Sequence, residues 1–177
     1  MFLQSDNDQE IARIQQKYAG RGFSEEDLQH CERVLGFQLP PIFRAYLSLG
    51  GKTGAGLSQD LSNDWPVGSD LLGAFDNAYL REIIAENPHG LQLPDDAFVI
   101  WWHEAYSFLF FRLSLGDTSP IFHYMEGDEP WWNAFKTIDV NLDAYMMQEA
   151  PLVWEDAKRI AAMNMLSDCL VRDVRSC

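Results

Sequence analysis

Two strand-like runs separated by only two residues constrain the fold of this chain more than any other feature. Residues 97–103 and 106–113 are rich in β-branched and aromatic side chains, which favour extended strands. Such a short connection allows antiparallel pairing only, because parallel strands need a crossover of about a dozen residues. A third run, 119–125, follows a Gly-Asp turn. We therefore predict an antiparallel β-meander in the middle of the chain.

Helix signals precede the meander. Residues 10–18 place apolar side chains on one helical stripe and predict a short helix or a frayed arm. Ser24 is an N-cap candidate, and Gly36 suits the left-handed position that follows a helix. Pro40 and Pro41 suit the first turn of the next helix, where their missing N–H groups cost nothing. We expect two well-defined helices between Ser24 and the meander.

Further helices are predicted beside and after the meander. Helical spacing is present in residues 75–87 and 138–147, and Pro151 starts a C-terminal helix. The apolar stripe of this last helix would hold Ile160, Met163, Leu170 and Val174. The pattern predicts an α+β fold, with N-terminal helices, a central antiparallel meander sheet packed against helices, and a C-terminal helical extension.

Length and composition bound the class of protein. A chain of 177 residues with 47% hydrophobic content can form one domain, 1–177, with a buried core, so disorder is excluded as the main state. Three cysteines, at positions 31, 169 and 177, form no short-range disulfide framework, which fits a reducing compartment. The sequence has no apolar run of about 18 residues and no signal-peptide pattern. We expect a cytoplasmic protein that does not bind membranes.

The charge is strongly acidic and unevenly placed. The chain has 13 Lys+Arg and 27 Asp+Glu, a net charge of −14. This argues against direct binding of nucleic acid, because such binding depends on basic side chains that neutralise phosphates. Residues 61–150 hold 15 acidic and 3 basic side chains, a net charge of −12. The excess can serve solubility alone, or it can form a negative face that meets a positive partner.

Motifs for catalysis, metals and cofactors are weak. The glycine-rich run 50–56 does not fit a phosphate-binding loop, because the position that must be glycine is Tyr46. The histidines have no zinc-site spacing, and no G-x-S-x-G motif occurs. A convergence of strand residues could still form an acid–base site in a small hydrolase, and its members would be His103, Glu104, His123 and Glu126. We expect no enzyme, no metal and no cofactor.

Two tryptophan pairs are the best candidates for contact residues. Trp101 and Trp102 are adjacent in a predicted strand, so they point to opposite faces and one can lie near solvent. Trp131 and Trp132 follow a run of carboxylates in a predicted loop. Tryptophan beside carboxylates is typical of a binding hot spot for Lys or Arg, although both pairs can also be core or loop anchors.

The order of several short motifs resembles the SUKH superfamily, which is named for a yeast regulator of cell-wall synthesis and its relatives. The family pattern E-x-x-L-G-x-x-L-P is present at residues 32–40. It is followed by an aromatic helix, a Gly pair, a strand start and a strand similar to the family's P-V-Y-H strand, at 43–47, 50–51, 93–100 and 119–124. Phe135 onward corresponds to the closing helix. The resemblance covers about residues 24–149, and 151–177 is an extension beyond it.

The resemblance implies a binding module without a conserved catalytic constellation. Most bacterial members resemble immunity proteins that neutralise a cognate polymorphic toxin, often a nuclease. We expect an immunity protein that occludes a basic toxin domain with its acidic surface. The candidate partner-binding residues are Asp95, Asp96, Trp102, Glu104, Glu126, Asp128, Glu129 and Trp131. The alternative is a regulatory protein-binding scaffold of the cell-wall-regulator type, and a small hydrolase is a third possibility.

Overall fold

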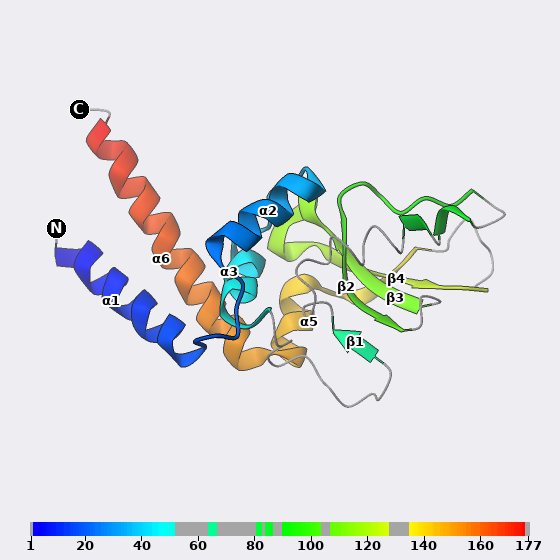
Figure 1. The fold of residues 1–177 in the computed structure, drawn as a ribbon, viewed down its shortest axis with the longest axis horizontal. Helices are drawn as coiled ribbons and strands as arrows, with labels where there is room; N and C mark the ends of the chain where they lie inside the picture. The colour runs from blue at the N-terminus through cyan, green and yellow to red at the C-terminus, as the bar shows by residue number, and fades with distance from the viewer. Residues whose placement is uncertain are drawn as a thin grey trace.

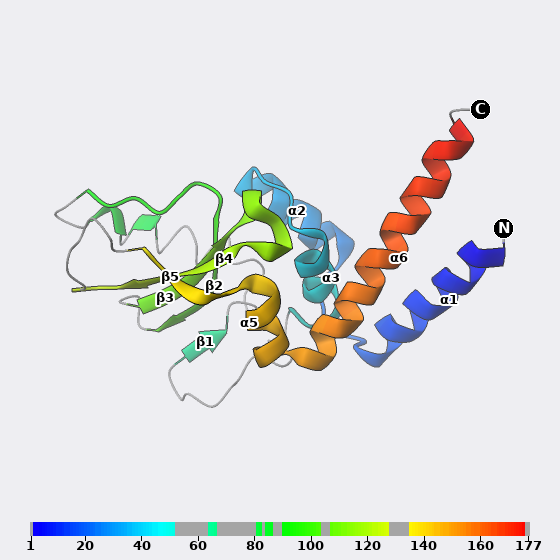
Figure 2. The same cartoon turned by 180° about the vertical axis from the view of Figure 1, so that it is seen from behind.

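The computed structural model describes residues 2–51, 64–66, 81–82, 84–86, 90–103, 107–127 and 135–175. Its helices are α1 (Phe2–Lys17), α2 (Glu25–Leu35), α3 (Pro41–Gly50), the 3₁₀ helix η2 (Leu113–Thr118), α5 (Leu142–Glu149) and α6 (Pro151–Arg175). Its strands are β1 (Asp64–Pro66), β2 (Ala97–His103), β3 (Ser107–Arg112), β4 (Pro120–Met125) and β5 (Lys136–Asn141). In Figures 1 and 2 the sheet lies at one end of the molecule and the chain termini lie at the other.

The sheet is the predicted antiparallel meander. Its strand order is β1-β2-β3-β4-β5, and every neighbouring pair is antiparallel. Strands β2 and β3 pair from Ala97↔Arg112 to His103↔Ser107, with a register shift between Val99 and Trp101. The α+β class, the N-terminal helices and the C-terminal helix are confirmed.

One predicted helix begins as a strand. Residues 136–141 form β5, and α5 starts only at Leu142. Along β5, Thr137, Asp139 and Asn141 are exposed while the residues between them are partly buried, which is the two-residue period of a strand at the edge of a sheet. Asn141 then caps α5 by accepting a hydrogen bond from the Ala144 N–H at 2.8 Å. The prediction of a helix over 138–147 was therefore wrong in its first part.

The local signals around α2 are confirmed. The Ser24 hydroxyl accepts from the Asp27 N–H at 3.2 Å, and the Asp27 carboxylate accepts from the Ser24 N–H at 3.0 Å. This reciprocal arrangement satisfies two amide donors at the start of the helix. At the other end Gly36 has φ 73°, the left-handed conformation that favours glycine.

Helix α3 is held by a residue that is distant in the sequence. Its first turn contains Pro41, as predicted. The Asp117 carboxylate, from η2, accepts hydrogen bonds from the Ile42 and Phe43 N–H groups at 3.1 and 2.9 Å. A carboxylate at this position interacts favourably with the positive end of the helix dipole. The Phe43 ring then packs edge-on against Phe98 and Phe111 of the sheet, at centroid distances of 5.2 and 5.0 Å.

The C-terminal helix is part of the core over its first half. Trp154 is fully buried, its ring lies 6.0 Å from that of Tyr46, and its indole N–H donates to Asp143 at 2.7 Å. Helix α1 lies beside α6, and Lys17 and Tyr18 both bond to the Asp156 carboxylate, at 2.8 and 2.9 Å. Both helices continue past α2 and α3 toward the chain termini (Figures 1 and 2).

Two other expectations fall largely outside the described residues. Of the helix predicted over 75–87, the described residues 81–82 and 84–85 are helical. Most of the glycine-rich run 50–56 is also outside, since Gly51 is its last described residue.

Candidate functional site

The motif that carries the family resemblance forms a polar clasp between α2 and α3. The buried carboxylate of Glu32 accepts hydrogen bonds from the Leu39 N–H and from Arg44 Nε, both at 3.1 Å. The Arg44 guanidinium also binds both carboxylate oxygens of Glu25, at 3.0 and 2.7 Å. Glu32, Gly36 and Leu39 are therefore required by the local fold, whatever the protein binds.

Two hollows adjoin this clasp. A polar pocket of about 640 Å³ lies over α2 and its C-terminal turn, and Glu25, Arg33, Phe37 and Arg44 contribute to its lining. A larger groove of about 800 Å³ runs between α1, α2, α3 and α6. Its lining mixes apolar and polar side chains, including Ile11, Leu28, Ser48 and Met165. Neither hollow contains any of the predicted contact residues.

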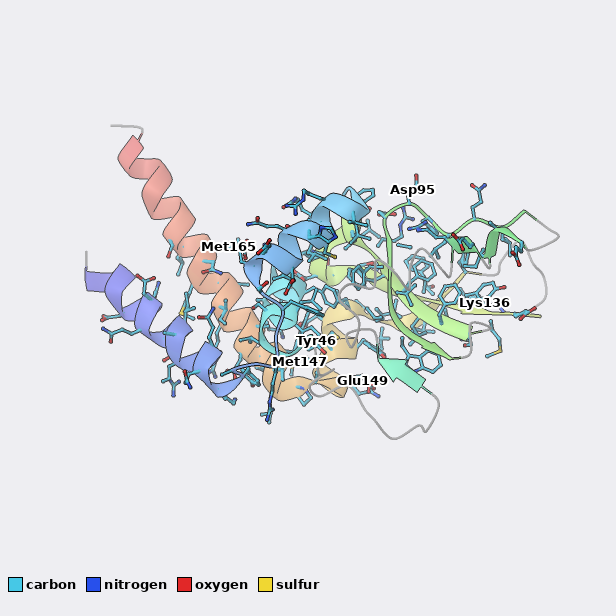
Figure 3. All side chains as sticks on the ribbon, in the orientation of Figure 1. Tyr46, Asp95, Lys136, Met147, Glu149 and Met165 are labelled. Atoms are coloured by element: carbon cyan, nitrogen blue, oxygen red, sulfur yellow. The ribbon has the colours of Figure 1, made fainter. Side chains whose placement is uncertain are left out.

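The predicted acidic residues do not form one cluster. Asp95 lies just before the start of β2, and Glu126 lies just after the end of β4. The end of β4 lies at the same edge of the sheet as the end of β2, because both pair with the start of β3. Asp95 and Glu126 therefore lie at opposite ends of β2. The length of β2 separates these two ends by about 20 Å, at a rise of about 3.3 Å per residue. Asp95 and Glu126 are both exposed, and Figure 3 shows Asp95 pointing away from the molecule.

Asp96 is not a surface residue, so its assignment to the partner-binding face was wrong. It is 3% exposed, and its carboxylate binds the Arg112 guanidinium together with the hydroxyl and N–H groups of Ser114. Burial alone would raise the pKa of Asp96, but the hydrogen bonds from Ser114 and Arg112 outweigh burial and hold that pKa below its usual value. The residue fixes the start of β2 to the end of β3.

The remaining predicted contact residues lie outside the described part of the molecule. They are Glu104, Asp128, Glu129, Trp131 and the side chain of Trp102. The strand ends that flank them are described, however, and they meet, because His103 pairs with Ser107 and Ser107 pairs with Met125. The segments 104–106 and 128–134 therefore connect to the sheet at the same end.

Three exposed carboxylates were missed as individual candidates, those of Glu82, Glu86 and Asp139. None of them, nor Asp95 or Glu126, forms an ion pair with another described residue. The acid excess of residues 61–150 already included them. The alternating pattern of β5 could have marked Asp139 as exposed, had it been recognised as a strand.

Two of the three basic residues of the same region, Arg81 and Arg112, bind groups inside the fold. Arg81 donates to the carbonyl oxygens of Leu93, Pro94 and Asp95, at 2.8, 2.7 and 2.9 Å. Burial lowers the pKa of Arg81 from its ordinary value, and three carbonyl acceptors compensate for the lost water. Arg112 is engaged by Asp96. Two of the three cations between residues 61 and 150 thus hold the fold together while the exposed carboxylates face solvent.

One pair of side chains has the geometry of a nucleophile and a base. The Ser107 hydroxyl lies 3.0 Å from Nε2 of His123 on the neighbouring strand, which is the distance that serine activation requires. Ser107 is only 4% exposed, however, and no described carboxylate bonds to the histidine ring. The contact is explained as a cross-strand hydrogen bond that satisfies a buried hydroxyl.

The thiol of Cys31 lies in an environment that keeps it unreactive. Cys31 is buried on α2, and burial raises the pKa of its thiol to about 12. Within the described ranges, no group of three or more His, Cys, Asp or Glu side chains is placed to hold a metal ion. The helices in the same ranges include none with the length and apolarity to span a membrane.

In comparisons with known proteins, no family model matches this chain, and neither does any curated protein or solved structure.

Proposed function

We propose that this protein is an immunity protein of the SUKH kind, which binds a cationic toxin domain and neutralises it. The observation that carries the proposal is the asymmetry of charge in the sheet region. Its exposed carboxylates form no ion pairs with described residues, while Arg81 and Arg112 are consumed by internal contacts. The motif order in residues 24–149 supports the same class independently of charge.

This asymmetry suits a basic partner. A surface with a regional net charge of −12 creates a field that attracts Lys- and Arg-rich surfaces before contact is made. A nuclease has such a surface, because its cleft must hold phosphates. Steered association of this kind reaches rate constants of about 10⁸ M⁻¹s⁻¹ at low salt and falls as salt rises. We place the contact at the end of the sheet bearing Glu126, where the segments with Trp102, Glu104, Asp128, Glu129 and Trp131 join it.

The test is rescue of growth by co-expression. The partner to use is the variable C-terminal domain of a protein encoded immediately upstream, expressed with and without this chain. Glu126→Lys should weaken rescue and slow association by about tenfold at low salt, because it reverses the charge at the proposed contact. The matched control is Asp8→Lys on α1, which changes the net charge equally at an exposed site far from the sheet.

The proposal makes two outcomes decisive. If the toxin domain kills cells in the presence of this chain as efficiently as in its absence, the protein is not its immunity protein. If Glu126→Lys and Asp8→Lys slow association equally, only the total charge matters and the sheet end is not the contact surface.

A further inference from the structure

One face of the sheet changes in burial along its length. Near the helices this face is sealed, since Phe98 and Phe111 are fully buried and the Phe43 ring of α3 packs against both. Two residues away from Phe111 along β3, and on the same face, Leu109 is only partly buried. The packing that seals this face is therefore looser at the level of Leu109.

A row of partly buried side chains crosses four strands at this level. Leu109 of β3 pairs with Trp101 of β2 on one side and with His123 of β4 on the other. His123 pairs in turn with Lys136 of β5, which Figure 3 shows at the end of the sheet away from the helices. Residues directly opposite each other in antiparallel strands share a face, and at about 4.8 Å per strand this row extends about 14 Å.

Met125 widens the row at the end of β4. It lies two residues after His123, so it shares the same face, and it is 39% exposed. We call Trp101, Leu109, His123, Met125 and Lys136 the sheet patch. The Ser107 hydroxyl lies 3.0 Å from Nε2 of His123, so the imidazole at the centre of the patch already has a fixed orientation before any partner binds.

An extra residue in β2 brings Trp101 to the sheet patch. β2 advances by two residues from Val99 to Trp101. The paired segment of β3 advances by one, from Phe110 to Leu109. Strict alternation would place Trp101 on the face of Val99 and Phe110, both of which are fully buried. A shift of one residue reverses the face that a side chain occupies, so Trp101 lies partly exposed beside Leu109.

We propose that the sheet patch is the centre of the contact with the cationic toxin domain, and that it receives an apolar side chain flanked by Lys or Arg. Tryptophan and methionine are enriched at the buried centre of protein interfaces, and charged groups surround that centre. Glu126 follows Met125 directly, is exposed, and forms no ion pair with another described residue. A cation beside the apolar side chain would therefore meet a carboxylate.

Charge favours this occupant over a second copy of the chain. Two copies that met through the sheet patch would bring together regions that each carry a net charge of −12, and these would repel. A cationic domain is attracted by the same field. The inference rests on the proposed function and adds the face of the sheet that the toxin domain covers.

The test measures association and dissociation rate constants separately, with the upstream-encoded toxin domain and the full chain in 0.15 M NaCl. Met125→Gln removes apolar surface without changing charge. It should raise the dissociation rate constant about tenfold and leave the association rate constant within about twofold, because contacts at the centre of an interface act on dissociation. Trp101→Ala should raise the dissociation rate constant about 100-fold. Glu126→Lys should instead slow association.

Two further variants identify the surface. Leu115→Gln is the matched control for Met125→Gln, since Leu115 is 52% exposed but lies in η2, which follows the opposite end of β3. Its rate constants should equal those of the wild type. Lys136→Glu should speed association about threefold, because it replaces a cation beside the proposed contact with an anion. Circular dichroism checks that each variant is folded, and Met125→Gln decides the matter if Trp101→Ala is not.

The negative outcomes separate this inference from the proposed function. A wild type that does not bind the toxin domain overturns both. A wild type that binds and rescues growth, while Met125→Gln dissociates no faster than it does, keeps the proposed function and overturns the sheet patch. The patch is also overturned if Leu115→Gln speeds dissociation as much as Met125→Gln. An association slowed by Lys136→Glu would exclude flanking cations on the partner.

Discussion

The terminal helices and the sheet region use their charged residues in different ways. Along the helices, cations and anions pair with each other, as in Arg13–Glu10 at 2.7 Å and Lys17–Asp156 at 2.8 Å. In the sheet region Arg81 and Arg112 bind internal groups, and the exposed carboxylates form no ion pairs with described residues. The comparison teaches that a net charge of −14 does not describe the whole surface. Residues 1–22 and 151–177 together are electrically neutral, so the acidic excess lies in the rest of the chain.

The largest expected effect tests how far along its length α6 is docked on the core. Trp154→Ala should lower the free energy of unfolding by about 4 kcal/mol, because it leaves a large cavity between α3 and α6. Leu166→Ala, on the same helix, should change it by less than about 0.5 kcal/mol in dilute solution. Urea denaturation followed by circular dichroism measures both. Equal losses would mean that α6 is docked on the core along its whole length. The contrast between its buried first half and its exposed second half would then be wrong.

The second prediction compares two neighbouring carboxylates of the sheet region. Asp96→Ala should cost about 3 kcal/mol, because it strands the Arg112 guanidinium and the Ser114 hydroxyl. Asp95→Ala should cost less than about 0.5 kcal/mol, since Asp95 is exposed. Chemical denaturation at pH 7 measures the difference. If the two variants are equally stable, the distinction between inward and outward carboxylates is wrong.

The third prediction concerns acid stability. Hydrogen bonds and cations hold the pKa values of Asp96, Asp143 and Asp156 below their usual range, while burial raises that of Asp117. The first three bind fewer protons in the folded state, so they stabilise the fold above the unfolded pKa of about 3.9. That stabilisation is lost as the pH falls through their folded pKa values. Asp117 acts in the opposite direction, but it is one group against three.

Urea midpoints at pH 7, 5 and 3 measure this dependence. We expect little change from pH 7 to 5 and a clear decrease at pH 3, smaller than the effect of Asp96→Ala. The slope below pH 4 should be shallower in Asp96→Asn, which no longer titrates at that position. A midpoint that rises on acidification would show that carboxylate repulsion outweighs the internal contacts.

The sequence predicted the parts of the fold that depend on neighbouring residues. Ser24 and Gly36 act on their own helix, so their signals were sufficient. The hairpin of β2 and β3 followed from a connection too short for any other pairing. Strand β5 was missed because its strand period was masked by the helical spacing of α5, which begins immediately after it at Leu142.

The candidate site was less predictable because it depends on distant contacts. Asp95 and Asp96 are identical in type and adjacent, and it is their distant partners that separate them. Asp96 turns inward because Arg112 and Ser114, sixteen and eighteen residues away, bind its carboxylate. Likewise, nothing near Asp117 in the sequence indicates that it caps α3, 74 and 75 residues earlier.

The smallest expected effect compares two buried tyrosines beside α6. The Tyr46 hydroxyl is the one buried side-chain polar atom without a hydrogen-bond partner among the described residues, whereas the Tyr18 hydroxyl donates to Asp156 at 2.9 Å. Tyr46→Phe should therefore stabilise the fold by about 1 kcal/mol, because it removes an unsatisfied group from the α3–α6 contact. Tyr18→Phe should destabilise it by about 1 kcal/mol, because it leaves Asp156 with one donor fewer where α1 meets α6. Each change removes a single oxygen atom from a buried ring, so differences in packing nearly cancel. Denaturation midpoints that move in the same direction would contradict the difference between the two hydroxyl groups, one unpaired and one hydrogen-bonded to Asp156.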